Sequence, residues 1–135
     1  MINNQLIALL KKLNIKAKNN GDIPVSAIIL YKNDIIAKAY NKKYKNNDPF
    51  AHAEILAIKK ACKKLNTSNL IECELYTTLY PCPMCREVIK ESKIRKVYYY
   101  TESEKIITNK VEYIKIDDGN GHFSNELKAF FKYKR

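Results

Sequence analysis

Apolar residues recur at intervals of three and four near the start of the chain. Within residues 4–18 four leucines have this spacing: Leu6, Leu9, Leu10 and Leu13. Such spacing places apolar side chains on one face of a helix, and Gly21, which follows, is a plausible stop. The pattern predicts an amphipathic helix over residues 4–18.

The pattern then changes to apolar runs rich in β-branched residues within residues 24–41. Lys32, Asn33 and Asp34 separate two such runs, and the second run resumes directly after them. A short polar interruption between two β-rich runs is typical of a hairpin. We therefore expect two strands joined at these three residues.

A second amphipathic helix is predicted after a polar loop at residues 42–48. Asp48 resembles an N-cap acceptor, and Pro49 suits the first turn of a helix. Within residues 51–65 one stripe consists of Ile55, Ile58, Cys62 and Leu65. We expect the helix to run through residues 51–65, with its start signalled by Asp48 and Pro49.

The rest of the chain alternates short strands and helices. Strands are expected at residues 73–80, 94–100 and 110–116, and helices at residues 83–93 and 124–134. This alternation predicts an α/β layered sheet with helices on both faces. We find no internal repeat, low-complexity tract or linker, so we expect a single domain over residues 1–135.

Composition narrows the class of protein. A chain of 135 residues with 46% hydrophobic residues can bury a core without disulfides. No apolar run approaches the roughly 18 residues of a membrane span, and the first residues lack the pattern of a cleavable leader. We therefore expect a cytoplasmic protein whose cysteines are reduced and free to bind metal.

The net charge of +11 permits two interpretations. Clustered lysines favour a polyanion such as a nucleic acid, because binding releases counterions. Lysine, asparagine and isoleucine are all abundant, however, which is also what an AT-rich coding sequence gives any protein. We weigh the two interpretations as about equal.

Two of the four cysteines, Cys82 and Cys85, form a Pro-Cys-x-x-Cys segment. This spacing alone serves zinc sites and redox sites alike. His52, however, lies at a predicted helix start, with Glu54 two residues further on. His-x-Glu followed by Pro-Cys-x-x-Cys is the signature of zinc-dependent nucleobase deaminases.

The residue types suit a catalytic zinc ion. One imidazole and two thiolates leave a fourth coordination position open. Positions 52 and 54 do not face the same way within a helix, so both reach one metal only if it lies beyond the N-terminal end of the helix. We expect His52, Cys82 and Cys85 to bind one Zn²⁺ there. Glu54, close but not a ligand, would carry a proton from water to a departing amine.

Other interpretations of these residues use fewer of them. A structural zinc site could add His122 as a fourth ligand, but Glu54 would then be a buried carboxylate without a role. A redox pair would use neither His52 nor Glu54. Cys62 and Cys73 are most simply small core residues. We favour the catalytic zinc site.

These segments resemble the cytidine deaminase superfamily and, within it, the bacterial tRNA adenosine deaminases. The resemblance is carried by "GDIPVSAII", "KAYN", "NDPFAHAEILAI", "LYTTLYPCPMC", "SKIRKVYY" and "AFFKYKR". It implies a three-layer cytidine-deaminase-like α/β fold with a five-stranded mixed sheet flanked by helices. It further implies His52, Cys82 and Cys85 as zinc ligands, Glu54 as proton shuttle and Asn41 as a contact to the substrate nucleoside. A flipped-out target base and a homodimer that helps to form the RNA surface are also implied.

The chain departs from the tRNA enzymes at three positions and in one loop. Tyr80 stands where they usually carry Glu, and Arg86 and Glu87 stand where they carry small residues. The stretch after residue 97 is also shorter, and "CREVI" is similar to the free cytidine deaminases.

Three hypotheses about function follow. The first is conversion of adenosine to inosine at the wobble position of tRNA. The second is deamination of a free base or nucleoside such as cytosine, guanine or cytidine, since "AIKKACKKL" and "PCPMC" also resemble guanine deaminases. The third is a non-catalytic RNA- or protein-binding module stapled by zinc, against which the intact Glu54 argues.

Overall fold

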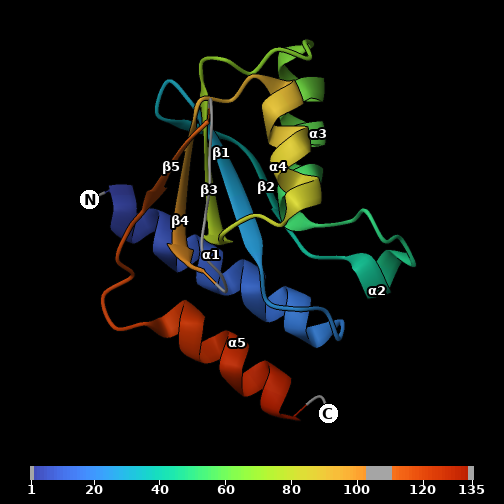
Figure 1. Ribbon diagram of the computed structural model, residues 1–135, viewed down its shortest axis with the longest axis vertical. Coiled ribbons are helices and arrows are strands. Elements are labelled where there is room, and N and C mark those ends of the chain that lie inside the picture. The colour runs from blue at the N-terminus through green and yellow to red at the C-terminus, as the bar shows by residue number, and fades with distance from the viewer. Residues whose placement is uncertain (1, 103–110, 134–135) are drawn as a thin grey trace.

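The computed structural model describes residues 2–102 and 111–133 (Figure 1). The elements follow in the order α1 (Ile2–Asn19), β1 (Ser26–Tyr31), β2 (Asp34–Tyr40), α2 (Lys43–Asn46), α3 (Ala53–Leu65), β3 (Cys73–Leu79), α4 (Pro83–Ser92), β4 (Lys96–Thr101), β5 (Glu112–Lys115) and α5 (His122–Tyr133). Most of the shortened stretch after β4, and the basic residues 134 and 135, lie outside the described residues. None of the described helices combines the length and apolar character that a membrane span requires.

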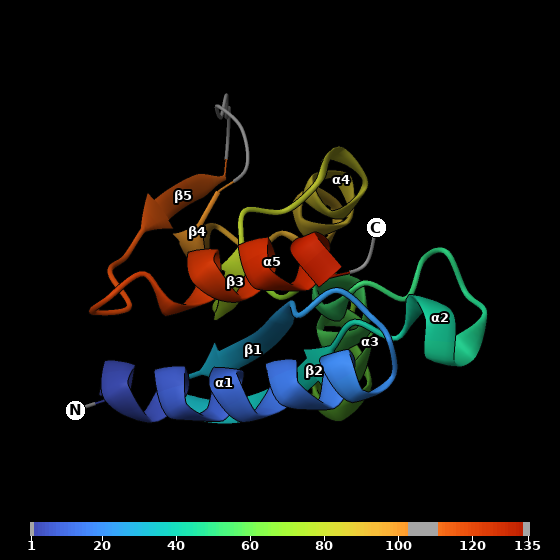
Figure 2. The ribbon, with the colours of Figure 1, turned by 90° about the horizontal axis from the view of Figure 1, so that it is seen from below.

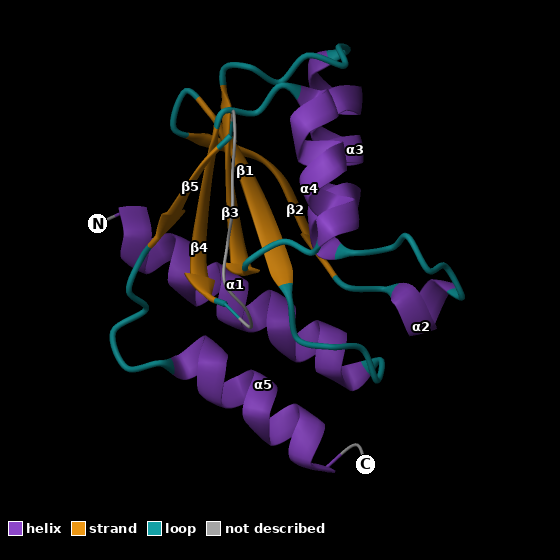
Figure 3. Cartoon of the chain, in the orientation of Figure 1, coloured by secondary structure: helices purple, strands orange, loops and turns teal. Residues whose placement is uncertain are grey.

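The strands form one mixed sheet in the order β2-β1-β3-β4-β5 (Figure 3). β1 is antiparallel to both β2 and β3, whereas β3, β4 and β5 are parallel to one another. Lys32 and Asn33 form the hairpin turn with φ of 51° and 68°, a conformation that suits the twist of the flanking strands. The expected hairpin is confirmed, with Asp34 as the first residue of β2.

Helices cover both faces of the sheet (Figures 1 and 2). In β1, Ala27 and Ile29 pack on the side of α3 and α4, whereas Ile28 and Leu30 pack on the side of α1, where Phe123 of α5 joins the same cluster. This alternation is what the pleat of a doubly covered strand produces. The expected three-layer α/β fold with a five-stranded mixed sheet is confirmed.

Small residues let α3 pack closely on the sheet. Ala53, Ala57 and Ala61 are fully buried, and Ile55 and Ile58 of the expected stripe lie beside them. Cys73 is buried in the same core, and the partly buried Cys62 packs against it, as expected of small core residues. The first turn of α3 is therefore held against one end of the sheet.

The start of α3 corrects the sequence-based prediction. The helix begins at Ala53 with His52 as its N-cap residue, so the prediction that Asp48 caps it was wrong. Asp48 Oδ1 instead accepts a hydrogen bond of 2.9 Å from the Phe50 N–H within a local turn. Residues 43–46, expected as loop, form the short helix α2. His122, also expected in a loop, is the first residue of α5.

Candidate active site

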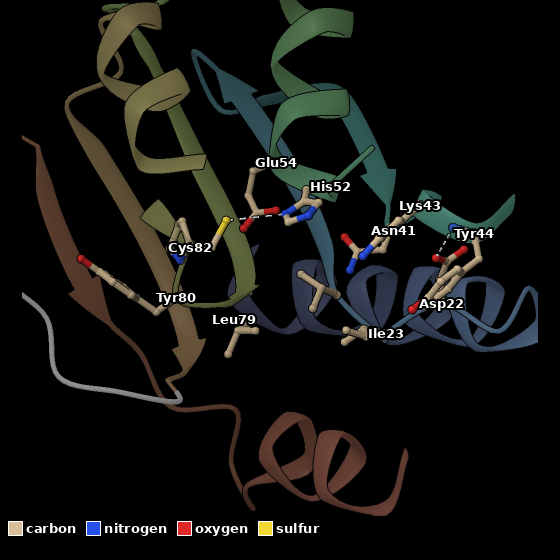
Figure 4. Close-up of a pocket in the computed structure, with 12 residues that line it drawn as sticks. Asp22, Ile23, Asn41, Lys43, Tyr44, His52, Glu54, Leu79, Tyr80 and Cys82 are labelled. Carbon is tan, nitrogen blue, oxygen red and sulfur yellow. Dashed lines mark hydrogen bonds between the residues drawn. The ribbon is translucent and has the colours of Figure 1, made fainter. Parts of the chain in front are cut away.

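Two helices begin at the same place in the molecule. His52 is the N-cap residue of α3 and Cys82 that of α4, and both have an extended backbone. Pro83 occupies the first turn of α4, where a missing N–H is harmless. Figure 4 shows His52 and Cys82 facing each other across the gap between the two helix starts. The site therefore lies where the positive ends of two helix dipoles meet, which favours anionic ligands.

The three expected zinc ligands come together. His52 Nδ1 lies 3.6 Å from Cys82 Sγ and 3.4 Å from Cys85 Sγ, and the three donor atoms all lie within 4.8 Å of one another. Two zinc bonds of ordinary length at the tetrahedral angle place N and S about 3.6 Å apart. The donors thus fit one zinc ion and leave a fourth position open. Among the described residues His122 is not part of this group.

His52 and Cys82 shift each other's pKa values in opposite directions. Hydrogen bonds from Cys85 and His52 lower the pKa of the Cys82 thiol. The hydrogen bond to Cys82 raises the pKa of His52 against the opposing effect of burial. A thiolate next to an imidazole proton is a pair that can exchange that proton for a metal ion.

Glu54 lies in the first turn of α3 and is buried, with 3% of its surface exposed. Its Oε1 has no hydrogen-bond partner within the described part of the chain. Burial raises the pKa of Glu54 to about 7, although the nearby His52 opposes this shift. A carboxyl group with a pKa near neutrality can both accept and donate a proton.

Asn41 follows β2 and lines the same pocket. Its Oδ1 accepts a hydrogen bond of 2.8 Å from the Ala53 N–H, the first backbone amide of α3. The amide group Nδ2 is left as the donor available to a substrate. Asn41 thus links the position of α3 to the pocket that α3 helps to line.

Asp22 is a pocket residue that the sequence did not reveal. It is 1% exposed, and its carboxylate accepts hydrogen bonds from the N–H groups of Tyr44, at 2.8 Å, and Lys45, at 3.4 Å (Figure 4). Asp22 therefore holds the start of α2, which forms the outer wall of the pocket. No local motif marks this role, because the partner lies 22 positions away.

These residues line a cavity of about 310 Å³, which is within the range of small-molecule sites. Its lining consists of Asp22, Ile23, Val25, Asn41, Lys43, Tyr44, His52, Glu54, Leu79, Tyr80, Pro81 and Cys82. Apolar walls with a few converging polar groups are typical of a site that binds and orients a small molecule.

Of the departures noted in the sequence, Tyr80 lines this cavity and Arg86 contacts Tyr80. In Figure 4 the Tyr80 side chain points away from His52 and Glu54. The guanidinium carbon of Arg86 lies 5.3 Å from the centre of the Tyr80 ring, and Glu87 is exposed on α4. Tyr80 therefore lines the pocket with its ring turned away from His52 and Glu54.

Comparison with known proteins agrees with this geometry. The model of the cytidine and deoxycytidylate deaminase zinc-binding region matches residues 2–101, about three quarters of the chain. The chain belongs to this deaminase family. A relative of this deaminase chain, the tRNA-specific adenosine deaminase of Aquifex aeolicus, is 48% identical over 90 residues. The aligned part covers 67% of the chain and 60% of the length of that relative.

Solved structures also resemble this chain. One comes from work on A-to-I editing by tRNA:A34 deaminases at the wobble position of transfer RNA. It aligns with a TM-score of 0.70 and 27% identity over 77% of this chain and 91% of that one. The guanine deaminase of Bacillus subtilis aligns with a TM-score of 0.64 and 30% identity over 93% of both chains. The resemblance expected from the sequence is therefore confirmed at the level of the family.

Proposed function

We propose that this chain is a zinc-dependent hydrolytic deaminase, one domain over residues 1–135, that converts adenosine to inosine at the wobble position of a tRNA. One observation carries the proposal: His52, Cys82 and Cys85 meet at a pocket with Glu54 buried beside them. The choice of tRNA is supported by the Aquifex relative and by the structure from work on tRNA:A34 deaminases.

In this proposal His52, Cys82 and Cys85 hold the zinc. Zinc bound there would lower the pKa of a water molecule at its open coordination position. Glu54 accepts a proton from the attacking water and delivers it to the amino nitrogen. The water oxygen bonds to the ring carbon, and its second proton passes to the neighbouring ring nitrogen. The bond from the ring carbon to the amino nitrogen breaks, ammonia leaves, and the ring carbon becomes a carbonyl. Asn41 donates a hydrogen bond from Nδ2 to the nucleoside.

We further propose a cytoplasmic homodimer. The net charge of +11 supports a polyanionic partner. Exposed apolar side chains next to the site, such as Tyr44 and Phe50, support a surface that is covered when the protein binds a second copy or its substrate.

The proposal is tested with tRNA from the protein's own organism. Zinc-loaded protein is incubated with that tRNA, and the digested RNA is analysed for inosine. Inosine is expected with the wild type and with E87Q, which removes an exposed carboxylate near the site. In E54Q it is expected to fall by at least about 100-fold, the smaller end of what a positioned proton carrier contributes. Full activity of E54Q with zinc bound would contradict the mechanism.

Deamination of a free base or nucleoside is the second candidate. The guanine deaminase of Bacillus subtilis favours it, because that structure covers 93% of this chain at 30% identity. Ammonia release from guanine, cytosine or cytidine, with no inosine in tRNA, would replace the first proposal by this one. If zinc-loaded wild type deaminates neither pool, a zinc-stapled binding module becomes the better interpretation.

A further inference from the structure

The segment that joins β3 to α4 is held by three hydrogen bonds, one to β4 and two from Arg86 of α4. Its first residue, Tyr80, donates its backbone N–H to the Thr101 carbonyl on β4 at 2.8 Å. Arg86 of α4 donates its backbone N–H to the Cys82 carbonyl at 2.9 Å, as an ordinary helical bond. The same arginine donates Nη1 to the Pro81 carbonyl at 3.1 Å. This last bond reaches back past the start of α4 to the residue that precedes Cys82.

Tyr80 supplies the surface on which Arg86 rests. Its ring is 5% exposed and packs edge-to-face on Tyr99 at 5.2 Å and on Tyr113 at 5.0 Å. The guanidinium carbon of Arg86 lies 5.3 Å from the ring centre, within the range of a cation–π contact. The Tyr80 hydroxyl is buried without a hydrogen-bond partner among the described residues, so the ring acts here through its face and edges.

The Arg86 side chain links the Pro81 carbonyl to the Tyr80 ring. The proline ring already fixes φ of Pro81, so rotation about ψ is the freedom that remains next to Cys82. A bond from a charged donor to the Pro81 carbonyl restrains that rotation more strongly than a bond from a neutral donor. The contact with Tyr80 keeps the guanidinium group in place, because the Tyr80 ring is itself packed against Tyr99 of β4 and Tyr113 of β5.

We propose that Arg86 and Tyr80 form a clamp on the Pro81 carbonyl that fixes the direction of Cys82 Sγ toward His52 and so slows the release of the bound metal. Both residues act as positioning residues. The clamp rests on the metal-binding part of the proposed function and is independent of the substrate.

The test measures zinc release without any substrate. Zinc-loaded R86M, R86K and wild type are mixed with an excess of a chromogenic chelator, and the release rate is followed. R86M is expected to release zinc at least about 10-fold faster, the smaller effect usual for groups that orient a metal ligand. K90M, which removes an exposed cation from the same helix, should keep the wild-type rate. An unchanged rate in R86M overturns the clamp.

R86K separates positioning from charge. Lysine keeps the positive charge but lacks the planar group that stacks and donates together. R86K is expected to release zinc nearly as fast as R86M. A wild-type rate in R86K would assign the effect to charge alone and overturn the clamp.

Tyr80 is tested in the same assay. Y80F keeps the ring that faces the Arg86 guanidinium and should keep the wild-type rate, whereas Y80L removes the ring and should approach R86M. The double variant Y80L/R86M should be no faster than the faster single variant, because the two side chains act as a unit. If the effects of the two single substitutions on the release rate multiply in the double variant, the two side chains do not act as a unit.

A spectroscopic readout excludes a general loss of stability. The Co²⁺-loaded R86M protein is expected to show a shifted thiolate-to-metal absorption band. Its unfolding midpoint is expected to equal that of K90M. An unshifted band together with a lowered midpoint would overturn the clamp. If the protein binds zinc tightly but deaminates no tRNA, the proposed function fails and the clamp stands.

Discussion

His52 and Cys82 occupy N-cap positions, where helices usually carry a side chain that accepts a backbone hydrogen bond. Neither makes a side-chain cap bond in this structure. Their donor atoms point instead at each other. For α3 the missing acceptor comes from Asn41, whose Oδ1 binds the Ala53 N–H. His52 and Cys82, which are best placed to reach a shared metal, thus do not cap their helices. At α3, Asn41 supplies the acceptor instead.

Substitutions of Asn41 should separate its two roles. N41D keeps an acceptor for the Ala53 N–H but loses the Nδ2 donor, so it is expected to retain stability and to raise KM for the substrate. N41A loses both groups and should also lower the free energy of unfolding by about 1 kcal/mol, as is usual for a lost helix cap. Urea denaturation and steady-state kinetics measure the two effects. Equal KM values for N41D and wild type would leave Asn41 with the capping role alone.

At the scale of elements, the short helix α2 depends on a distant carboxylate. Asp22 binds the N–H groups of Tyr44 and Lys45, and Tyr44 forms part of the pocket wall. D22A is expected to speed hydrogen exchange at these two amides and to raise KM more than it lowers kcat, because the catalytic groups are not touched. D34A, which removes an exposed carboxylate from the hairpin, is the control. Unchanged hydrogen exchange at both amides in D22A would show that α2 is stable without the Asp22 hydrogen bonds.

The same elements show where the sequence was sufficient and where it was not. The hairpin and most of the helices could be predicted, because each depends on spacing within a short segment. The grouping of His52, Cys82 and Cys85 could be predicted because two short motifs, His-x-Glu and Cys-x-x-Cys, together match a known signature. The start of α3 and the existence of α2 could not, because Asn41 acts 12 positions away and Asp22 acts 22 positions away. Asp48 offered a local cap in the sequence, but in the structure the acceptor at the start of α3 is Asn41.

The helix α5 is fastened to α1 by a buried polar group. Glu126 accepts a hydrogen bond of 2.8 Å from Asn14 Nδ2 and pairs with Lys18 Nζ at 2.8 Å. Asn14 is fully buried, so E126A leaves its amide unpaired and should lower the free energy of unfolding by about 1–3 kcal/mol. E126Q keeps an acceptor and should lose less. Urea denaturation measures both, with the exposed E91A as control; E126A equal to E91A would contradict the fastening.

At the scale of the whole molecule, the excess of positive charge makes a prediction that salt can test. If the +11 charge serves a polyanion, binding of tRNA to the inactive E54Q protein should weaken linearly in a plot of log affinity against log salt. The slope should be about 0.7 to 0.9 per neutralised phosphate. Filter binding between 50 and 200 mM KCl, about the range in which such effects are large, measures it. A flat line would favour the compositional origin of the charge.

The distance along the chain between two of the candidate ligands also bears on the entropy of the unfolded state. His52 and Cys82 are 30 positions apart, and α3 and β3 lie between them. An ion held by both closes that stretch into a ring, and in the chain-entropy model a cross-link of this span removes about 3–4 kcal/mol of freedom from the unfolded chain. Chelation should therefore lower the urea midpoint, and added zinc should restore it. The molar ratio of zinc to protein in a preparation would then give the fraction of molecules that carry this added stability.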